Sequence, residues 1–122
     1  MILADTSIWI DHLRSENREM RKHLEQGNIL IHPFVIAELA LGSLRRRMET
    51  LALLDLLPQV QMPNLAEVRL MIEARRLYSM GIGLIDAHLI ASVFVNSPTV
   101  LWTRDKPLRK VAENLGIHAK MN

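Results

Sequence analysis

Cysteine is absent from this chain of 122 residues, so a disulfide framework, a thiolate nucleophile and a cysteine-based zinc site are all excluded. Long hydrophobic runs are missing too, because the longest apolar stretches fall short of the ~18 residues that a membrane-spanning helix needs. No basic region precedes the apolar N-terminal residues, as it would in a signal peptide. We therefore expect a cytoplasmic protein that has no membrane segment.

Several catalytic motifs are also absent. The five histidines form no HExxH or other metal-ligand pair, so no zinc site is expected. There is no GxSxG elbow, P-loop or GxGxxG, so acyl transfer and nucleotide-binding folds lack their signals. Charge excludes little, because 15 Lys and Arg face 13 Asp and Glu, and a net charge of +2 neither requires nor forbids a nucleic-acid partner.

What the chain does have is apolar residues, 49% of the total, which is enough for the core of one domain spanning residues 1–122. Short apolar runs alternate with segments of helical periodicity. This alternation predicts an α/β fold with a parallel sheet covered on both faces. The expected strands are 2–5, 29–32, 60–62, 99–102 and 117–119, and the expected helices are 6–15, 17–28, 33–43, 43–57, 64–81, 84–95 and 106–116.

Four acidic residues stand out by their positions. Asp5 closes the first predicted strand, and Asp105 follows the strand at 99–102 with two residues between. Glu38 and Asp86 lie in helices that are otherwise almost wholly apolar. Taken singly, three of the four could cap a helix or interact with its dipole, but no capping role explains Glu38.

Taken together, the four acids favour a metal site. In an open parallel sheet, ligands bind beyond the carboxyl ends of the strands, which is also where the following helices begin. Carboxylates gathered there repel one another and cannot all stay ionised without a cation. Because oxygen donors select a hard divalent ion, we expect Mg²⁺ or Mn²⁺. The predicted ligands are Asp5, Glu38, Asp86 and Asp105.

Hydroxyl groups flank two of these acids. Thr6 and Ser7 follow the first acid, and Thr103 precedes the last, so each could bond a carboxylate or a metal-bound water. Local capping explains Thr6 and Ser7 at least as well, so a site role is favoured only for Thr103. Arg104 is the best candidate for contacting a substrate phosphate, and His88 is expected to be structural.

A hard-metal carboxylate site at a sheet edge handles phosphates, and two functions use one. A phosphodiesterase adds basic surroundings for a polynucleotide, whereas a receiver-like signalling domain adds an aspartyl nucleophile and a lysine, here Lys106. The receiver alternative fits poorly, because Thr6 stands where it needs a second acid and His32 where it needs the nucleophile. A non-catalytic binding module with a structural ion also stays open.

Four segments, each with one of the acids, occur in a familiar order. They are ILADTSIWID, VIAELALG, LIDAHLIAS and VLWTRDKPL. The ordered set resembles the PIN domain, in particular the VapC-type toxins of bacterial toxin–antitoxin pairs, over residues 2 to about 119. The resemblance implies a three-layer α/β/α fold with a mainly parallel sheet, and an Mg²⁺- or Mn²⁺-dependent endoribonuclease that leaves 5′-phosphate and 3′-hydroxyl ends.

The resemblance also assigns roles and partners. Asp5, Asp86 and Asp105 would hold the metal, Glu38 would coordinate it or position the attacking water, and the family's hydroxyl position falls on Thr103. Members of this type form homodimers that cleave RNA, and a VapB-type antitoxin silences each by laying its C-terminal tail across the toxin. The leucine-rich segment 48–57, together with Trp9, is a candidate docking surface for that antitoxin, and core packing is the alternative.

Overall fold

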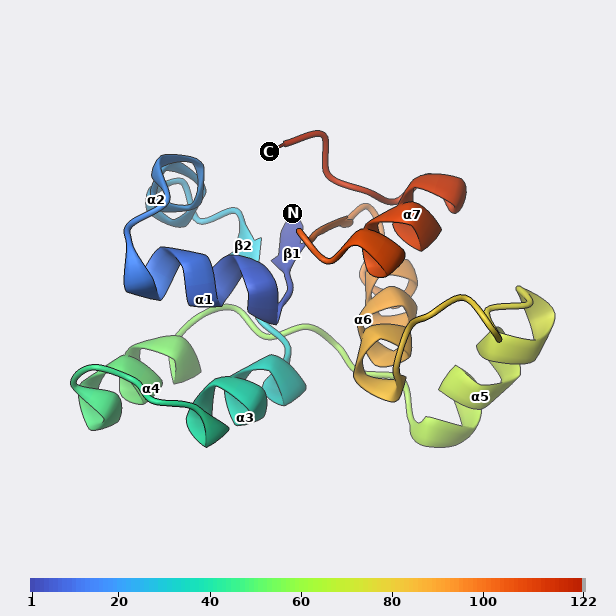
Figure 1. Ribbon diagram of the computed structural model, residues 1–122, viewed down its shortest axis with the longest axis horizontal. Coiled ribbons are helices and arrows are strands. Elements are labelled where there is room, and N and C mark those ends of the chain that lie inside the picture. The colour runs from blue at the N-terminus through green and yellow to red at the C-terminus, as the bar shows by residue number, and fades with distance from the viewer. Residues whose placement is uncertain (122) are drawn as a thin grey trace.

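The computed structural model describes residues 1–121 and centres on a parallel sheet of three short strands (Figure 1). Strand β1 (Ile2–Ala4) lies between β2 (Ile29–Leu30) and β3 (Val100–Trp102), so the order is β2-β1-β3. Nearly every residue of the three strands is buried, as expected for a parallel sheet with both faces covered. The carboxyl ends of β1 and β3 therefore open side by side at one edge.

Helices flank the sheet, which confirms the predicted α/β/α arrangement (Figure 1). In Figure 1 the helices of the first half of the chain lie on one side of the strands, and α5 to α7 lie on the other. Helix α6 packs against β3 and is covered in turn by α5. The helices are α1 (Thr6–Arg14), α2 (Arg18–Glu25), α3 (Pro33–Leu41), α4 (Arg47–Asp55), α5 (Leu65–Ala74), α6 (Leu84–Val95) and α7 (Lys106–Asn114).

Two of the four predicted site acids cap helices that begin shortly after strands. Asp5 caps α1, where Oδ1 accepts a hydrogen bond from the N–H of Ile8, and Asp105 caps α7 through the N–H of Leu108. The side-chain oxygens thus satisfy backbone donors that a helix start leaves without partners. Capping and strand order together bring both carboxylates to the same edge of the sheet.

The two outer strands that the sequence predicts are reduced to isolated parallel bridges. Gln59 pairs with Ile31, and His118 pairs with Leu101, so no ladder forms over 60–62 or 117–119. The prediction of short strands at these two places was therefore wrong. Each segment contributes only a pair of backbone hydrogen bonds before the chain turns away, to Ile31 in one case and to Leu101 in the other.

Two helices are shorter than their periodicity predicts. The helix expected over 43–57 begins at Arg47, because Arg46 adopts a left-handed backbone with φ of 48° and reverses the chain after α3. The helix expected over 64–81 ends at Ala74. Apolar spacing continues through both segments, but backbone reversals interrupt the hydrogen-bond ladder.

The core depends most on α6, in which every residue from Ala87 to Val93 is buried. Among the residues that the structure describes, no helix combines the length and apolar character that crossing a membrane requires. Trp9 belongs to this core with only 2% of its surface exposed, so for Trp9 the alternative of core packing holds rather than that of a docking surface. The segment 48–57 is divided, since Leu54 is buried whereas Leu53 remains 66% exposed.

Candidate functional site

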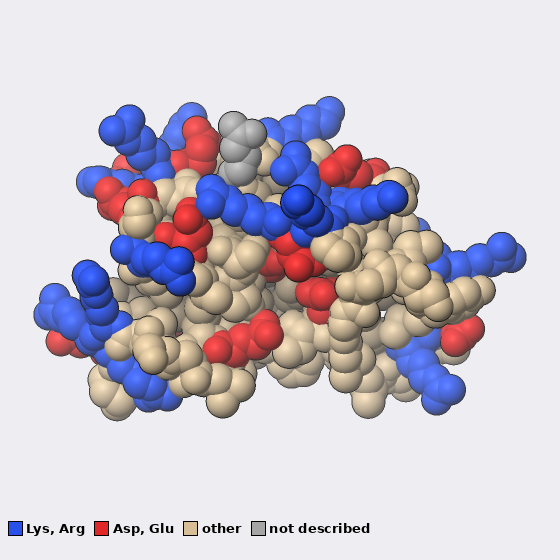
Figure 2. Space-filling model, viewed as in Figure 1, with Lys and Arg blue, Asp and Glu red and all other residues tan. Residues whose placement is uncertain are grey.

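The four predicted acids come from four different helices and lie at the edge where β1 and β3 end. Asp5 and Asp105 cap α1 and α7, Asp86 lies in the first turn of α6, and Glu38 lies in α3. Figure 2 shows acidic side chains gathered in the middle of this face, with a band of Lys and Arg beside them. The structure therefore brings together residues that are up to 100 positions apart in the sequence.

Asp5 is the most buried of the four, with 5% of its surface exposed. Its Oδ1 accepts a 2.5 Å hydrogen bond from the hydroxyl of Ser7, and its Oδ2 accepts one from the hydroxyl of Thr103. Burial raises the pKa of Asp5 above its ordinary value, and these hydrogen bonds partly offset that rise because they favour the ionised form. The carboxylate is thus held in one orientation by neutral donors.

Both hydroxyls are themselves held by the loop that follows β3. The Oγ of Ser7 accepts from the N–H of Arg104 at 3.0 Å, and the Oγ1 of Thr103 accepts from the N–H of Asp105 at 3.0 Å. Asp5 closes the arrangement by donating its own N–H to the carbonyl of Trp102. The start of α1 and the loop after β3 form one connected polar unit.

Thr6 holds the second acid. Its hydroxyl donates to Oε1 of Glu38 at 2.6 Å, which links the first turn of α1 to α3. The sequence left two alternatives for Thr6 and Ser7, a bond to a carboxylate or local capping that was at least as good an explanation, and in the structure both hydroxyls bond carboxylates of the predicted site. One signal could have found them: the first residues of a helix that begins after a parallel strand lie at the same sheet edge as the capping acid.

Asp86 is half-buried, and its Oδ2 accepts the N–H of Gly83 at 3.0 Å. Burial raises its pKa, the charges of Asp105 and Glu38 raise it further, and the bond from Gly83 opposes the rise. Within residues 1–121 no basic side chain forms an ion pair with Asp86. Its charge is therefore left without a cationic partner among the described side chains.

Arg104, the predicted phosphate contact, is held by an acid of its own. Its Nη1 lies 3.1 Å from Oδ2 of Asp11, and 44% of its side chain is exposed. Binding a phosphate would require Arg104 to share or leave this ion pair.

His88 is buried beside the ring of Phe34, at 4.8 Å between centroids, and burial lowers its pKa, as expected for a structural histidine.

The chemistry of the donor set fits a hard divalent cation. Carboxylates whose pKa values are raised, and which the described chain does not pair with Lys or Arg, are suitable ligands for Mg²⁺ or Mn²⁺. They line the edge of the sheet rather than converging on one point. In the part of the chain that the structure describes, no three His, Asp or Glu side chains are close enough together to surround an ion.

Comparison with known proteins shows the family of this chain. The family model described as the PIN domain matches residues 2–114. The chain belongs to the PIN-domain family. Two relatives named "Ribonuclease VapC32", from two strains of Mycobacterium tuberculosis, are each 41% identical over 117 residues, which is 96% of this chain and 94% of theirs. The predicted membership of this family and of its VapC type is confirmed.

We expect Asp86→Asn to make the metal-free PIN domain more stable at pH 7. Because the folded protein raises the pKa of Asp86 above its ordinary value of 3.8, ionising this carboxyl opposes folding above that pH. The gain should disappear as the pH falls below about 3.8, where both folded and unfolded states hold the proton. Asparagine keeps an oxygen that can accept the N–H of Gly83.

Urea unfolding in EDTA at pH 7 and pH 3 measures this difference. Glu73→Gln, on the exposed side of α5, is the control for losing one negative charge. If Asp86→Asn is no more stable than the wild type at pH 7, the uncompensated charge of Asp86 does not oppose folding.

Proposed function

We propose that this PIN domain is an Mg²⁺- or Mn²⁺-dependent endoribonuclease and the toxin of a type II toxin–antitoxin pair. The observation that carries the proposal is the group of four carboxylates at the β1–β3 edge, none of which forms an ion pair with a basic side chain of residues 1–121. The 41% identity to a ribonuclease of the VapC type supports the substrate class. We treat residues 1–122 as one domain.

Each site residue has a distinct task in this mechanism. Asp5, Asp86 and Asp105 would hold the metal, which would lower the pKa of a bound water and offset charge on the phosphate under attack. Glu38 coordinates the same ion or accepts the proton of the attacking water, and Thr6 keeps its carboxylate in place. Thr103 orients Asp5 through its hydroxyl.

The surroundings of the acids suit a polynucleotide. The band of Lys and Arg in Figure 2 lies beside the acidic group, so phosphates that flank the cleaved bond meet positive charge. Arg104 lies next to Asp105 in sequence, and its guanidinium carries five N–H donors, enough to serve both Asp11 and a phosphate. We propose that it contacts the RNA backbone.

The purified protein is expected to cut a mixture of cellular RNAs in Mn²⁺ and not in EDTA. Asp5→Asn should lower the rate by about 100-fold or more, because a metal contributes several kcal/mol and each 1.4 kcal/mol is a factor of ten. The products should carry 5′-phosphates, which terminal labelling measures.

Asp55→Asn is the matched control, since Asp55 is an exposed acid at the end of α4. Cleavage that persists at the wild-type rate in Asp5→Asn, or that continues in EDTA, would contradict the proposal. Cleavage lost equally in Asp55→Asn would show that removing any acid has this effect.

Arg104→Gln should weaken RNA binding and leave kcat nearly unchanged. Loss of one phosphate contact is expected to reduce the slope of log affinity against log salt by about 1. Asp11→Asn should act in the opposite direction, because it releases Arg104 from its ion pair. KM measured at several salt concentrations tests both, with Arg69→Gln on exposed α5 as the control. Identical salt slopes for wild type and Arg104→Gln would contradict the contact.

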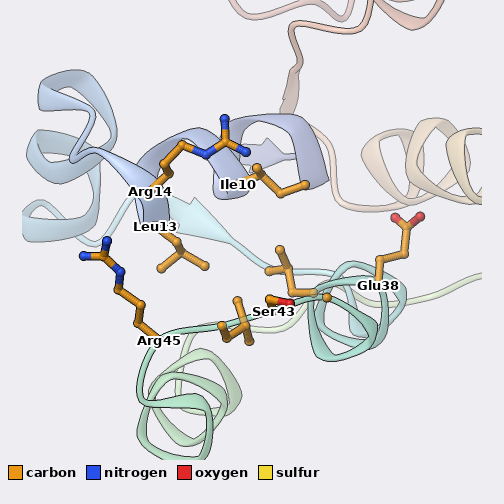
Figure 3. A pocket seen from close by; sticks show the side chains of 9 residues that line it. Ile10, Leu13, Arg14, Glu38, Ser43 and Arg45 are labelled. Carbon is orange, nitrogen blue, oxygen red and sulfur yellow. The ribbon is translucent and has the colours of Figure 1, made fainter.

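For the VapB-type antitoxin we propose a site in the groove between α1 and α3. This groove encloses about 390 Å³, and its apolar lining includes Ile10, Leu13 and Leu44. Figure 3 shows Glu38 at one end and Arg45 at the other. A segment with an apolar middle, a basic side chain toward Glu38 and an acidic one toward Arg45 would match these charges and approach the active site.

Ile10→Glu should reduce co-purification with the antitoxin of the same gene pair about 10-fold or more, because it places a charge in an apolar contact. Leu70→Glu, an equally drastic change at an exposed residue of α5, is the control. Recovery of the antitoxin with Ile10→Glu at the wild-type level would contradict this docking site.

We also propose that the toxin is a homodimer. Light scattering on the same samples measures its mass in solution, and a monomer would refute the homodimer.

A further inference from the structure

The carboxylate of Asp5 is held from both sides by hydroxyl groups in equivalent settings. Ser7 donates to Oδ1 and Thr103 donates to Oδ2. Each hydroxyl oxygen also accepts a hydrogen bond from a backbone N–H of the loop after β3. Arg104 donates to Ser7 and Asp105 donates to Thr103, both at 3.0 Å. Each hydroxyl therefore accepts from the loop and donates to the carboxylate.

The direction of these bonds is determined by the backbone. An N–H group can only donate, so each hydroxyl accepts there and keeps its single proton for Asp5. The carboxylate has about four lone-pair positions, and the hydroxyls of Ser7 and Thr103 and the N–H of Ile8 occupy three of them. These donors from two sides define the orientation of the carboxylate.

Helix capping does not account for Ser7. Asp5 already caps α1 through the N–H of Ile8, and the hydroxyl oxygen of Ser7 accepts a hydrogen bond from the backbone N–H of Arg104, 97 positions along the chain. This bond crosses from the start of α1 to the loop that carries Asp105. Removing the Ser7 hydroxyl would release the carboxylate of Asp5 and also the loop that positions the second acid, Asp105.

We propose that Ser7 is a positioning residue of the metal centre, which fixes the orientation of Asp5 and its distance from the loop of Asp105. This inference rests on the proposed metal-dependent function. Partners that orient metal ligands commonly change metal affinity or activity by about 10- to 100-fold when they are removed. Ser7 should therefore act on Mn²⁺ binding itself, before any RNA is present.

The test compares two side chains of the same shape at position 7. Ser7→Thr keeps the hydroxyl and Ser7→Val replaces it with a methyl group, so they differ only in the ability to bridge Asp5 and Arg104. Free Mn²⁺ measured by electron paramagnetic resonance during titration yields the dissociation constant without RNA. We expect Ser7→Val to weaken Mn²⁺ binding about 10-fold or more, and Ser7→Thr to stay close to the wild type.

Ser15→Ala, at the exposed C-terminal end of α1, is the control and should bind Mn²⁺ like the wild type. Thermal unfolding is followed for every variant, and Ser7→Ala, which adds no bulk, replaces Ser7→Val if the valine variant does not fold. Equal Mn²⁺ affinity with and without the hydroxyl overturns the proposal, as does equal loss in Ser7→Thr and Ser7→Val.

RNA cleavage separates this result from the proposed function. If the wild type cuts RNA and only the effect of Ser7 is missing, the role of Ser7 is overturned and the ribonuclease stands. If Mn²⁺ binds and depends on the hydroxyl while no RNA is cut, the positioning role is supported and the nuclease proposal fails. A wild type that binds no Mn²⁺ overturns both.

Discussion

The pairing of β1 with β3 sets the position of Asp5 relative to the loop that carries Asp105. It places Asp5 beside the loop 103–105, so that the hydroxyls of Ser7 and Thr103 can reach one carboxylate from both sides. Without this parallel register, the acid at the end of the first strand and the acid after the last would belong to separate surfaces.

A second constraint is that the acids are held by neutral groups. Asp5 bonds hydroxyls, Glu38 bonds the hydroxyl of Thr6, and Asp86 bonds a backbone N–H. Arg104, which directly precedes Asp105 in the sequence, is paired with Asp11. Neutral donors orient a carboxylate without cancelling its charge, so the negative field that attracts a divalent cation is preserved at some cost to the stability of the metal-free fold.

Glu38 links the two surfaces on which the proposed function depends. It receives the hydrogen bond from Thr6 at the site and also lines one end of the groove between α1 and α3. A partner lying in this groove therefore reaches the active site by direct contact. An antitoxin bound in the groove would therefore block the acids through its contact with Glu38. This inhibition would need no conformational change elsewhere in the fold.

The local pattern of the sequence already determined which acids matter. Asp5 and Asp105 follow buried strands, Asp86 begins a helix that is apolar all round, and Glu38 interrupts another, and these features are visible without coordinates. Burial of apolar residues is encoded locally, so the main helices and the parallel sheet could be predicted. The start of the helix expected over 43–57 could not be predicted, because the backbone reversal at Arg46 depends on the path that the folded chain takes after it.

The partners of the side chains were decided by tertiary structure alone. Whether Ser7 caps its own helix or bridges to Arg104 depends on a contact across 97 positions, and sequence spacing carries no information about such a contact. The ion pair of Arg104 with Asp11 and the burial of Trp9 have the same origin. The sequence by itself determined the chemistry available at the sheet edge. Only the packing of β1 against β3 decided which hydroxyl holds which carboxylate, since a hydrogen bond forms within about 3 Å and that distance is set by the whole fold.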